Sequence, residues 1–393
     1  MEIALMSLTL FSIALFGAFA LAMPEEAAAL QAGTTEMSQE AAQNALLAND
    51  GRIYPASASG EKLSSTWADH RFNFKAIDKL FVAADTSSIP CTMVVPLSSS
   101  SQATMNVRGL TAVADVVFLL DPASGRNACR TIASSAFRSS SSLRSISNLE
   151  KTSLVSIGNR AFEKCGSLTG VIELPATCVR IGAQAFYGCG RISEVVLGGS
   201  GAKIGDEAFA RCSSLATVSL GGVATIGQAA FQRCNGLKKV VIPGSCTSIG
   251  DCAFSRCLKL ANVKFAANAR LKRIGLEAFE RTPLKSVTLP DSCAKVGRSA
   301  FVKCKSLKKF FAGRGLKSIG ERAFEGCAKL SKVVFGYEKA PVKAGSFLFR
   351  FTKVARGKVR IGVPGSLLDR YLAKASKSSS SSAWRGCAFA VSG

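Results

Sequence analysis

One feature of the sequence, an Ala-Phe pair that returns every 22 to 25 residues, restricts the fold more than any other. A unit this short cannot bury an apolar core by itself, whereas stacked units bury a continuous core. The period therefore predicts a solenoid in which the Phe side chains form a spine. The nine pairs place phenylalanine at Phe137, Phe162, Phe186, Phe209, Phe231, Phe254, Phe279, Phe301 and Phe324, and we expect a degenerate tenth copy to place Phe347 in the same slot.

Other positions recur in phase with the Phe, and we count them from it. Ile-Gly or Val-Gly stands at −5 and −4, Cys at +3, Leu or Ile at +6, and apolar residues at +9 and usually +11. The alternation from +6 to +11 predicts a short strand with one buried face, which Pro or Gly then ends. We attribute the recurring glycines to turns that need positive φ. In the Phe254 copy these positions are Ile249, Gly250, Cys257, Leu260 and Val263.

The unit resembles that of the BspA-like leucine-rich-repeat family, which reads Leu-x-x-Val-x-Leu-Pro, a variable stretch, and then Ile-Gly-x-x-Ala-Phe-x-x-Cys. The match covers about residues 131–363. Val363-Pro364, followed by Tyr371 and Trp384, is similar to the segment that often closes such arrays. The resemblance implies an α/β solenoid, a leucine-rich-repeat array of about nine to ten units that is rich in strand and turn, with caps at both ends. It also implies a secreted or surface-exposed binding protein, often an adhesin, and no particular ligand.

We divide the chain into four parts. Residues 1–23 are apolar and indicate a signal peptide, although about 21 apolar residues also suffice for an uncleaved signal anchor, and a misplaced gene start remains a third interpretation. The other three parts are an N-terminal linker and non-repeat cap at 24–130, the leucine-rich-repeat array at 131–346, and a degenerate last repeat with a C-terminal cap at 347–393. Within 24–130 we expect one short helix at Met37–Leu47 and strands at Thr92–Leu97 and Val113–Leu120.

Half of the 14 cysteines share the +3 slot. Stacked identical side chains point the same way, so we expect small buried fillers there; disulfides and metal binding stay open as alternatives. Three more share a slot at −8, namely Cys178, Cys246 and Cys293, while Cys91, Cys129, Cys252 and Cys387 stand outside both ladders, and a Cys91–Cys129 bridge stays open. The +3 cysteines are Cys165, Cys189, Cys212, Cys234, Cys257, Cys304 and Cys327.

The residues that catalysis usually requires are scarce. His70 is the only histidine, which removes most arrangements with a His base or metal ligand. The repeats contain no paired carboxylates with glycosidase spacing and no phosphate-binding Gly-Lys-Ser/Thr loop. We therefore expect a protein that is not an enzyme, with no cofactor and no metal.

The charge is strongly asymmetric. Residues 1–150 hold 10 basic and 13 acidic residues, and residues 151–393 hold 40 and 13. Such a field attracts polyanions such as acidic glycans, nucleic acid or anionic lipid. Six of the eight +2 positions in the central copies are basic, and we name them the basic ladder: Lys164, Arg211, Arg233, Arg256, Arg281 and Lys303. A secondary set on the exposed strand face comprises Lys239, Lys264, Lys309 and Lys332.

Three interpretations of the basic ladder stay open: a stripe that binds a polyanion, an interface with an acidic protein, and charge that only keeps the protein soluble. We favour a non-catalytic secreted or cell-surface recognition or adhesion protein that binds a macromolecular ligand, either protein or acidic glycan, along the array. The alternative is an intracellular or membrane-anchored scaffold for an acidic protein, anionic lipid or nucleic acid. Aromatic residues do not interleave with the ladder, which disfavours base stacking. Contact with a membrane is expected only through an uncleaved N-terminal segment.

Overall fold

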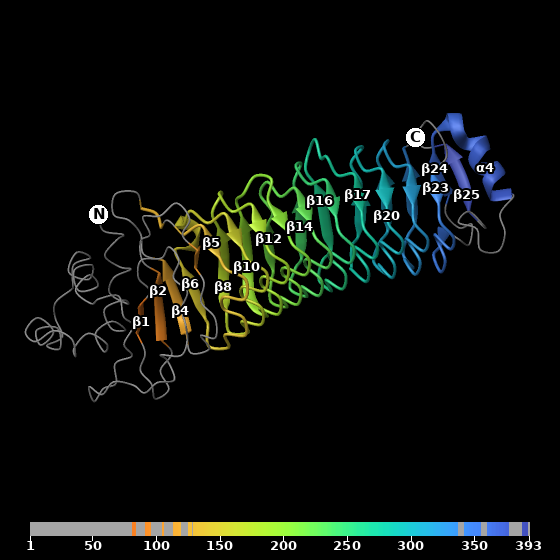
Figure 1. Ribbon diagram of the computed structural model, residues 1–393. Helices are drawn as coiled ribbons and strands as arrows, with labels where there is room; N and C mark the ends of the chain where they lie inside the picture. Colours follow the sequence, from red (N-terminus) through yellow and green to blue (C-terminus); the bar gives the residue numbers. More distant parts are fainter. Residues whose placement is uncertain are drawn as a thin grey trace, which may run out of the picture.

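The computed structural model describes residues 81–83, 91–95, 104–105, 113–118, 125–127, 129–336, 342–354, 360–376 and 387–391. The leader at 1–23, the helix expected at Met37–Leu47 and His70 lie outside these residues. The described chain coils into an elongated solenoid that runs from β1 at one end to β25 at the other (Figure 1). The solenoid fold is therefore confirmed.

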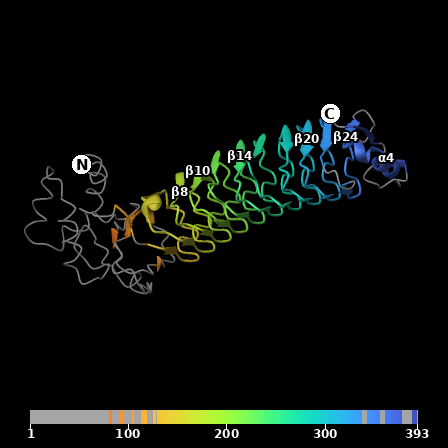
Figure 2. The same cartoon turned by 90° about the horizontal axis from the view of Figure 1, so that it is seen from above.

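Each full turn of the solenoid holds one longer strand and one strand of two residues, and Figure 2 shows the longer strands along one side. The longer strands are β1 (Phe81–Ala83), β2 (Cys91–Val95), β4 (Val113–Phe118), β6 (Ser145–Ser147), β8 (Thr169–Leu174), β10 (Arg191–Leu197), β12 (Thr217–Ser219), β14 (Lys239–Ile242), β16 (Asn262–Phe265), β18 (Ser286–Thr288), β20 (Lys309–Ala312), β22 (Lys332–Phe335), β24 (Arg360–Val363) and β25 (Ala388–Val391). The two-residue strands are β3 (Thr104–Met105), β5 (Thr131–Ile132), β7 (Ser156–Ile157), β9 (Arg180–Ile181), β11 (Lys203–Ile204), β13 (Thr225–Ile226), β15 (Ser248–Ile249), β17 (Arg273–Ile274), β19 (Lys295–Val296), β21 (Ser318–Ile319) and β23 (Lys343–Ala344).

The two sets of strands pair differently. The two-residue strands form one parallel sheet of 11 strands, in the order β23 to β3, in which the buried −5 residues stay in register. The longer strands are divided among four sheets, β1-β2-β4-β6, β8-β10-β12, β14-β16 and β18-β20-β22-β24-β25. Of the described pairs, β1 with β2 is antiparallel and the others are parallel.

Helix is a minor component of the described chain. The only α-helix there is α4 (Leu368–Ser376), preceded by the 3-10 helix η3 (Gly365–Leu367), and η1 (Leu149–Lys151) lies near the other end. None of the helices in the described part is long and apolar enough to cross a bilayer. The fold is therefore a parallel β-solenoid, with less helix than the α/β label implies.

The phenylalanine spine is confirmed in the nine main copies. These rings are 0 to 1% exposed, and adjacent rings stack with centroids 5.0 to 5.5 Å apart and planes within 9° of parallel. The tenth position was assigned wrongly. Phe349, not Phe347, stacks on Phe324 at 5.6 Å, because Gly345 occupies the −4 slot only if the copy is counted from Phe349.

Positive φ does not explain the glycines at −4. A Cβ at Gly250 would lie 2.5 Å from the carbonyl carbon of Gly227 in the preceding copy, and the other −4 glycines meet the preceding backbone as closely. These residues are glycines because the stacked backbones touch there. Positive φ belongs to a different set of the described glycines: Gly125, Gly170, Gly188, Gly201, Gly221 and Gly326.

The +3 cysteines are free and fully buried, as expected of core fillers. Each thiol also donates a hydrogen bond to the carbonyl of the spine Phe one copy earlier, for example from Cys257 Sγ to Phe231 O at 3.0 Å. The hydroxyl of Thr282, in the same slot, instead bonds Phe279 O of its own copy at 2.8 Å. Burial raises the pKa of Cys212 and Cys257 to about 12.

The second cysteine ladder has one more member than expected. Cys129 lies eight residues before Phe137, in the slot that Cys178, Cys246 and Cys293 occupy in other copies. Each of these four thiols donates a hydrogen bond to the backbone carbonyl two residues later, from Cys129 to Thr131 O at 3.7 Å. Placing Cys129 outside both ladders was therefore wrong. The Cys91–Cys129 bridge involves a side chain outside the described set and stays a prediction.

The strands expected before the array are present at Cys91–Val95 and Val113–Phe118. β2 pairs in parallel with β4, and β4 with β6, so these strands stack in the same way as the copies that follow. At the other end, the Tyr371 hydroxyl of α4 accepts a hydrogen bond from Val342 N at 2.8 Å. The division at residues 130 and 346 and the two caps stay predictions.

Candidate binding surface

The basic ladder lies in the turn segment that runs from −4 to +2 of each copy, beside the spine. Every +2 residue of the eight central copies has a left-handed backbone. The six Lys and Arg residues have φ between 55° and 63°, and Gly188 and Gly326 have φ of 75° and 74°. A left-handed conformation costs about 1–2 kcal/mol for a residue with a Cβ and almost nothing for Gly. The backbone at +2 therefore favours Gly, and it gives no reason for a long basic side chain.

The −2 position provides a comparison within the same molecule. Its residues are also left-handed, with φ between 51° and 58° in the same eight copies, yet their charges are mixed. Two are basic, two are acidic and four are uncharged, whereas +2 holds only Lys, Arg or Gly. The conformation therefore does not select positive charge. The −2 residues are Arg160, Gln184, Glu207, Ala229, Cys252, Glu277, Ser299 and Arg322.

The structure brings five of the six ladder residues together in consecutive copies. From Arg211 to Lys303 the copies rise by 5.3 to 5.5 Å at the spine, inside the ~8 Å screening length of physiological salt. Gly188 separates Lys164 from this run. Five of the six side chains are exposed and Arg256 is half-buried. A linear ligand aligned with the solenoid axis can therefore reach several positive charges at once.

An acidic residue neutralises part of the run, which the sequence did not lead us to expect. Glu280, at +1, contacts Arg256 at 3.4 Å and Arg281 at 3.2 Å. Within the described residues, Lys164, Arg211, Arg233 and Lys303 form no ion pair with an acidic side chain. Arg211 lies over the Tyr187 ring at 5.5 Å. Lys164, Arg211, Arg233 and Lys303 are therefore the ladder residues that remain available to a ligand.

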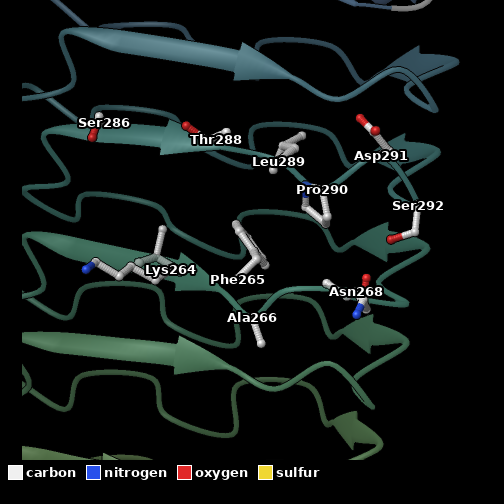
Figure 3. Close-up of a pocket in the computed structure, with 12 residues that line it drawn as sticks. Lys264, Phe265, Ala266, Asn268, Ser286, Thr288, Leu289, Pro290, Asp291 and Ser292 are labelled. Carbon is white, nitrogen blue, oxygen red and sulfur yellow. The ribbon is translucent and has the colours of Figure 1, made fainter.

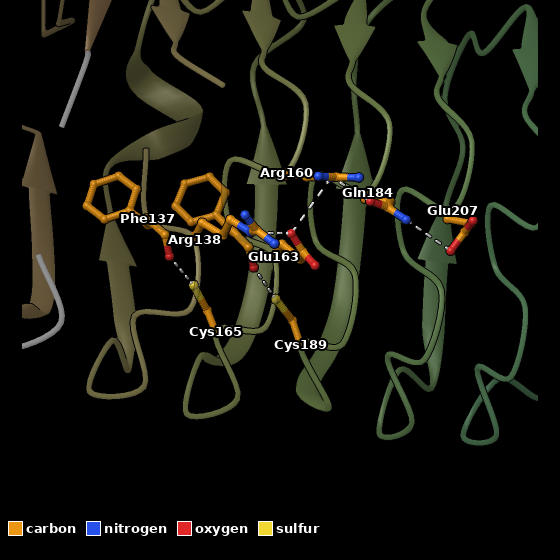
Figure 4. A network of polar contacts seen from close by, with 9 residues as sticks. Phe137, Arg138, Arg160, Glu163, Cys165, Gln184, Cys189 and Glu207 are labelled. Atoms are coloured by element: carbon orange, nitrogen blue, oxygen red, sulfur yellow. Dashed lines mark hydrogen bonds and ion pairs between the residues drawn. The ribbon is translucent and has the colours of Figure 1, made fainter. Parts of the chain in front are cut away.

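Near the N-terminal end of the array the other turn positions are internally paired (Figure 4). Arg138 contacts the buried Glu163 at 2.7 Å, and Arg160 donates to Gln184 at 2.8 Å, which in turn donates to Glu207 at 3.3 Å. These contacts link successive copies and leave little net charge at −2 and +1. Among the −2, +1 and +2 turn positions, positive charge without an acidic partner is thus concentrated at +2.

The strand lysines occupy a separate surface. Lys239, Lys264, Lys309 and Lys332 are all exposed on the outer face of the longer strands, and Lys309 pairs with Lys332 in register. The Lys332 ammonium lies 5.5 Å from the Phe311 ring. The strands begin beyond the buried +3 and +6 residues, so the structure does not join this set to the ladder.

Sequence reasoning missed a third basic column, at −6 on the two-residue strands. Its basic members are exposed, and Arg273 and Lys295 are adjacent in register. The same counting from the Phe would have revealed it. The column shows that positive charge is not confined to one side of the C-terminal half. Its basic residues are Arg180, Lys203, Arg273, Lys295 and Lys343.

A comparison with family models agrees with the repeat geometry. The model of the BspA type leucine-rich repeat region, six copies long, matches residues 130–261 and 224–350. A leucine-rich repeat protein from Bacteroides ovatus is 20% identical, with 82% of this chain and 100% of that chain covered and a TM-score of 0.45. A leucine rich cell surface protein from Faecalibacterium prausnitzii is 20% identical, with 71% and 73% covered and a TM-score of 0.39. No curated protein matches the chain.

Proposed function

Since the chain belongs to the BspA-type leucine-rich-repeat family, we propose that it is a non-catalytic recognition or adhesion protein, secreted or held at the cell surface, whose array binds a macromolecular ligand. The ligand is a polyanion, most simply an acidic glycan, and it lies along the basic ladder. The Faecalibacterium protein is a cell surface protein, and the apolar leader at 1–23 is consistent with the same location here.

The observation that supports this proposal most strongly is the contrast between the two left-handed columns. Both impose the same backbone strain, but only +2 is restricted to Lys, Arg and Gly in the eight central copies; the first and last copies carry Ser139 and Phe351 there. Neighbouring like charges repel by a few tenths of a kcal/mol each, so their repetition needs a compensating interaction. A linear polyanion supplies it, because each contact also releases counterions.

The test compares two variants that lose equal charge. Arg211→Gly, Arg233→Gly and Lys303→Gly together remove three unpaired ladder charges, and Gly is the residue that this backbone already carries in two copies. The control, Arg273→Gln with Lys295→Gln and Lys317→Gln, removes three exposed charges from the side of the two-residue strands. Affinity for a sulfated polysaccharide and for a uronic-acid polysaccharide is measured by calorimetry at physiological salt.

We expect the ladder variant to lose at least tenfold in affinity and the control to lose much less. Equal losses would mean that net charge alone is responsible, because any protein this basic attracts polyanions. An acidic protein bound in preference to both polysaccharides, with the same sensitivity to the ladder variant, would identify the ligand as protein instead of glycan.

A further inference from the structure

Two neighbouring copies of unequal length lie at one of the interruptions in the stack of longer strands. The Phe254 copy has 25 residues and the Phe279 copy has 22. The long copy has extra residues after β16, and the short copy lacks one before β18, at Thr282-Pro283-Leu284. β16 and β18 are adjacent in the solenoid but belong to different sheets, as do β6 and β8 and also β12 and β14. The two-residue strands β15, β17 and β19 pair without a break, so the irregularity is confined to one side.

A hollow of about 700 Å³ opens where β16 and β18 end. Its volume falls within the ~300–1,000 Å³ range of small-molecule sites. Figure 3 shows Phe265 and Pro290 in the centre of the view, with Thr288 above them and Asn268 and Ser292 toward the loops. The hollow is thus formed by irregular loops on a rigid scaffold, which is where binding sites usually occur.

The lining combines an apolar floor with short polar side chains. The Phe265 ring is partly buried and Leu289 is buried, while Thr288 and Asn268 are exposed at the rim. The Asp291 carboxylate is fixed, because its Oδ1 accepts a hydrogen bond from Arg314 N at 2.8 Å. The rim also carries hydroxyl and amide groups, which can both donate and accept hydrogen bonds.

The charges at the hollow balance. Lys264 and Asp291 are the only charged residues among the side chains that line it, one of each sign. The lining of the hollow therefore lacks the positive excess of the ladder and of the −6 column. A site with balanced charge, an aromatic face and several hydrogen-bonding groups suits a neutral, hydroxyl-rich ligand.

The spacing argues against an inserted peptide strand. Such a strand would need β16 and β18 to be about 9–10 Å apart, twice the normal strand spacing. The spine rings of the two copies are 5.3 Å apart, as elsewhere, and Lys285 N bonds Ala261 O at 3.2 Å where the strands begin. The hollow is therefore closed at one end, and it accepts a compact unit and not an extended chain.

We propose that this hollow binds one neutral saccharide unit of a glycan. The C–H face of a pyranose ring packs on Phe265, while adjacent hydroxyls bond to Asp291, Asn268 and Thr288. The site is distinct from the basic ladder and does not depend on the function proposed for it.

The experiment presents the full chain to an array of neutral oligosaccharides with hexose and N-acetylhexosamine ends, beside sulfated and uronic-acid glycans. The neutral glycan that binds best is then titrated by calorimetry. We expect its affinity to change less than twofold between low and physiological salt. Thr288→Val and Asp291→Asn should each weaken it about tenfold, the effect of one lost hydrogen bond. Both changes preserve shape, and Asn can still accept from Arg314 N.

Phe265→Leu removes the aromatic face but keeps the buried aliphatic volume, and it should abolish detectable binding without unfolding the array. The matched control is Thr217→Val, the same change at an exposed strand position three copies earlier. The proposal is overturned if no neutral glycan binds, or if Thr288→Val and Thr217→Val have equal effects. Binding of sulfated glycans alone, lost in the ladder variant, would support the function proposed above and overturn this one.

Discussion

Phe254→Ala removes one ring from the middle of the spine. The ring is fully buried and stacks on Phe231 and Phe279, each at 5.3 Å with planes within 6° of parallel. A core Phe→Ala change costs about 3–5 kcal/mol of the free energy of unfolding. Two ring contacts at about 0.5–1.5 kcal/mol each account for about 1–3 kcal/mol of this, and lost burial and the cavity account for the rest. Phe254→Leu should therefore cost about 1–3 kcal/mol.

The assay is urea unfolding followed by circular dichroism, together with hydrogen exchange by mass spectrometry. Each copy contacts mainly its neighbours, so protection should fall first in β13, β15 and β17 and stay unchanged in β7 and β9. If Phe254→Ala leaves the free energy of unfolding within about 0.5 kcal/mol of the parent value, the ring does not hold the stack together and the spine interpretation fails.

Further predictions concern the backbone, the thiols and the ladder. Gly250→Ala should cost about 1–3 kcal/mol because its Cβ would meet the Gly227 backbone, whereas Gly166→Ala, with open space around it, should be nearly neutral in the same unfolding assay. Cys257 should resist thiol reagents in the native protein. Between about pH 9 and pH 12 only the unfolded chain loses the thiol proton of Cys257, so the free energy of unfolding should be constant below pH 9 and fall toward pH 12. Urea unfolding midpoints at about pH 8 and about pH 10.5 test this. Arg233→Gly should stabilise the array by up to about 1 kcal/mol, and a loss of stability would contradict the strain inferred at +2.

The repeat could be predicted from sequence because each of its positions has a simple physical role. The Phe, the −5 aliphatic residue and the +3 Cys recur in phase, and all of them are buried. The tenth copy was misplaced because three Phe residues, Phe347, Phe349 and Phe351, compete within five positions. Gly345 would have resolved the choice, because −4 must be Gly wherever two backbones touch.

Other features depend on geometry that the sequence expresses only indirectly. The left-handed backbone at +2 is signalled by Gly188 and Gly326 in the same slot, but Lys and Arg conceal it elsewhere. Arg281 follows Glu280 in the sequence, but the contact of Glu280 with Arg256 arises because +1 of one copy meets +2 of the preceding copy on stacking. The hollow lies where a 25-residue copy precedes a 22-residue copy. The difference in length can be read from the sequence, but the shape of the surface there cannot.

The most direct test of recognition by the ladder is the salt dependence of binding to a sulfated polysaccharide. On nucleic acid each phosphate contact contributes about 0.7–0.9 to the slope of log K against log salt. If the same counterion release operates here, replacing Arg211, Arg233 and Lys303 by Gly should reduce the slope by about 2, and the Arg273, Lys295 and Lys317 control should leave it within about 0.5 of the parent. Identical slopes in all three proteins would contradict recognition by the ladder.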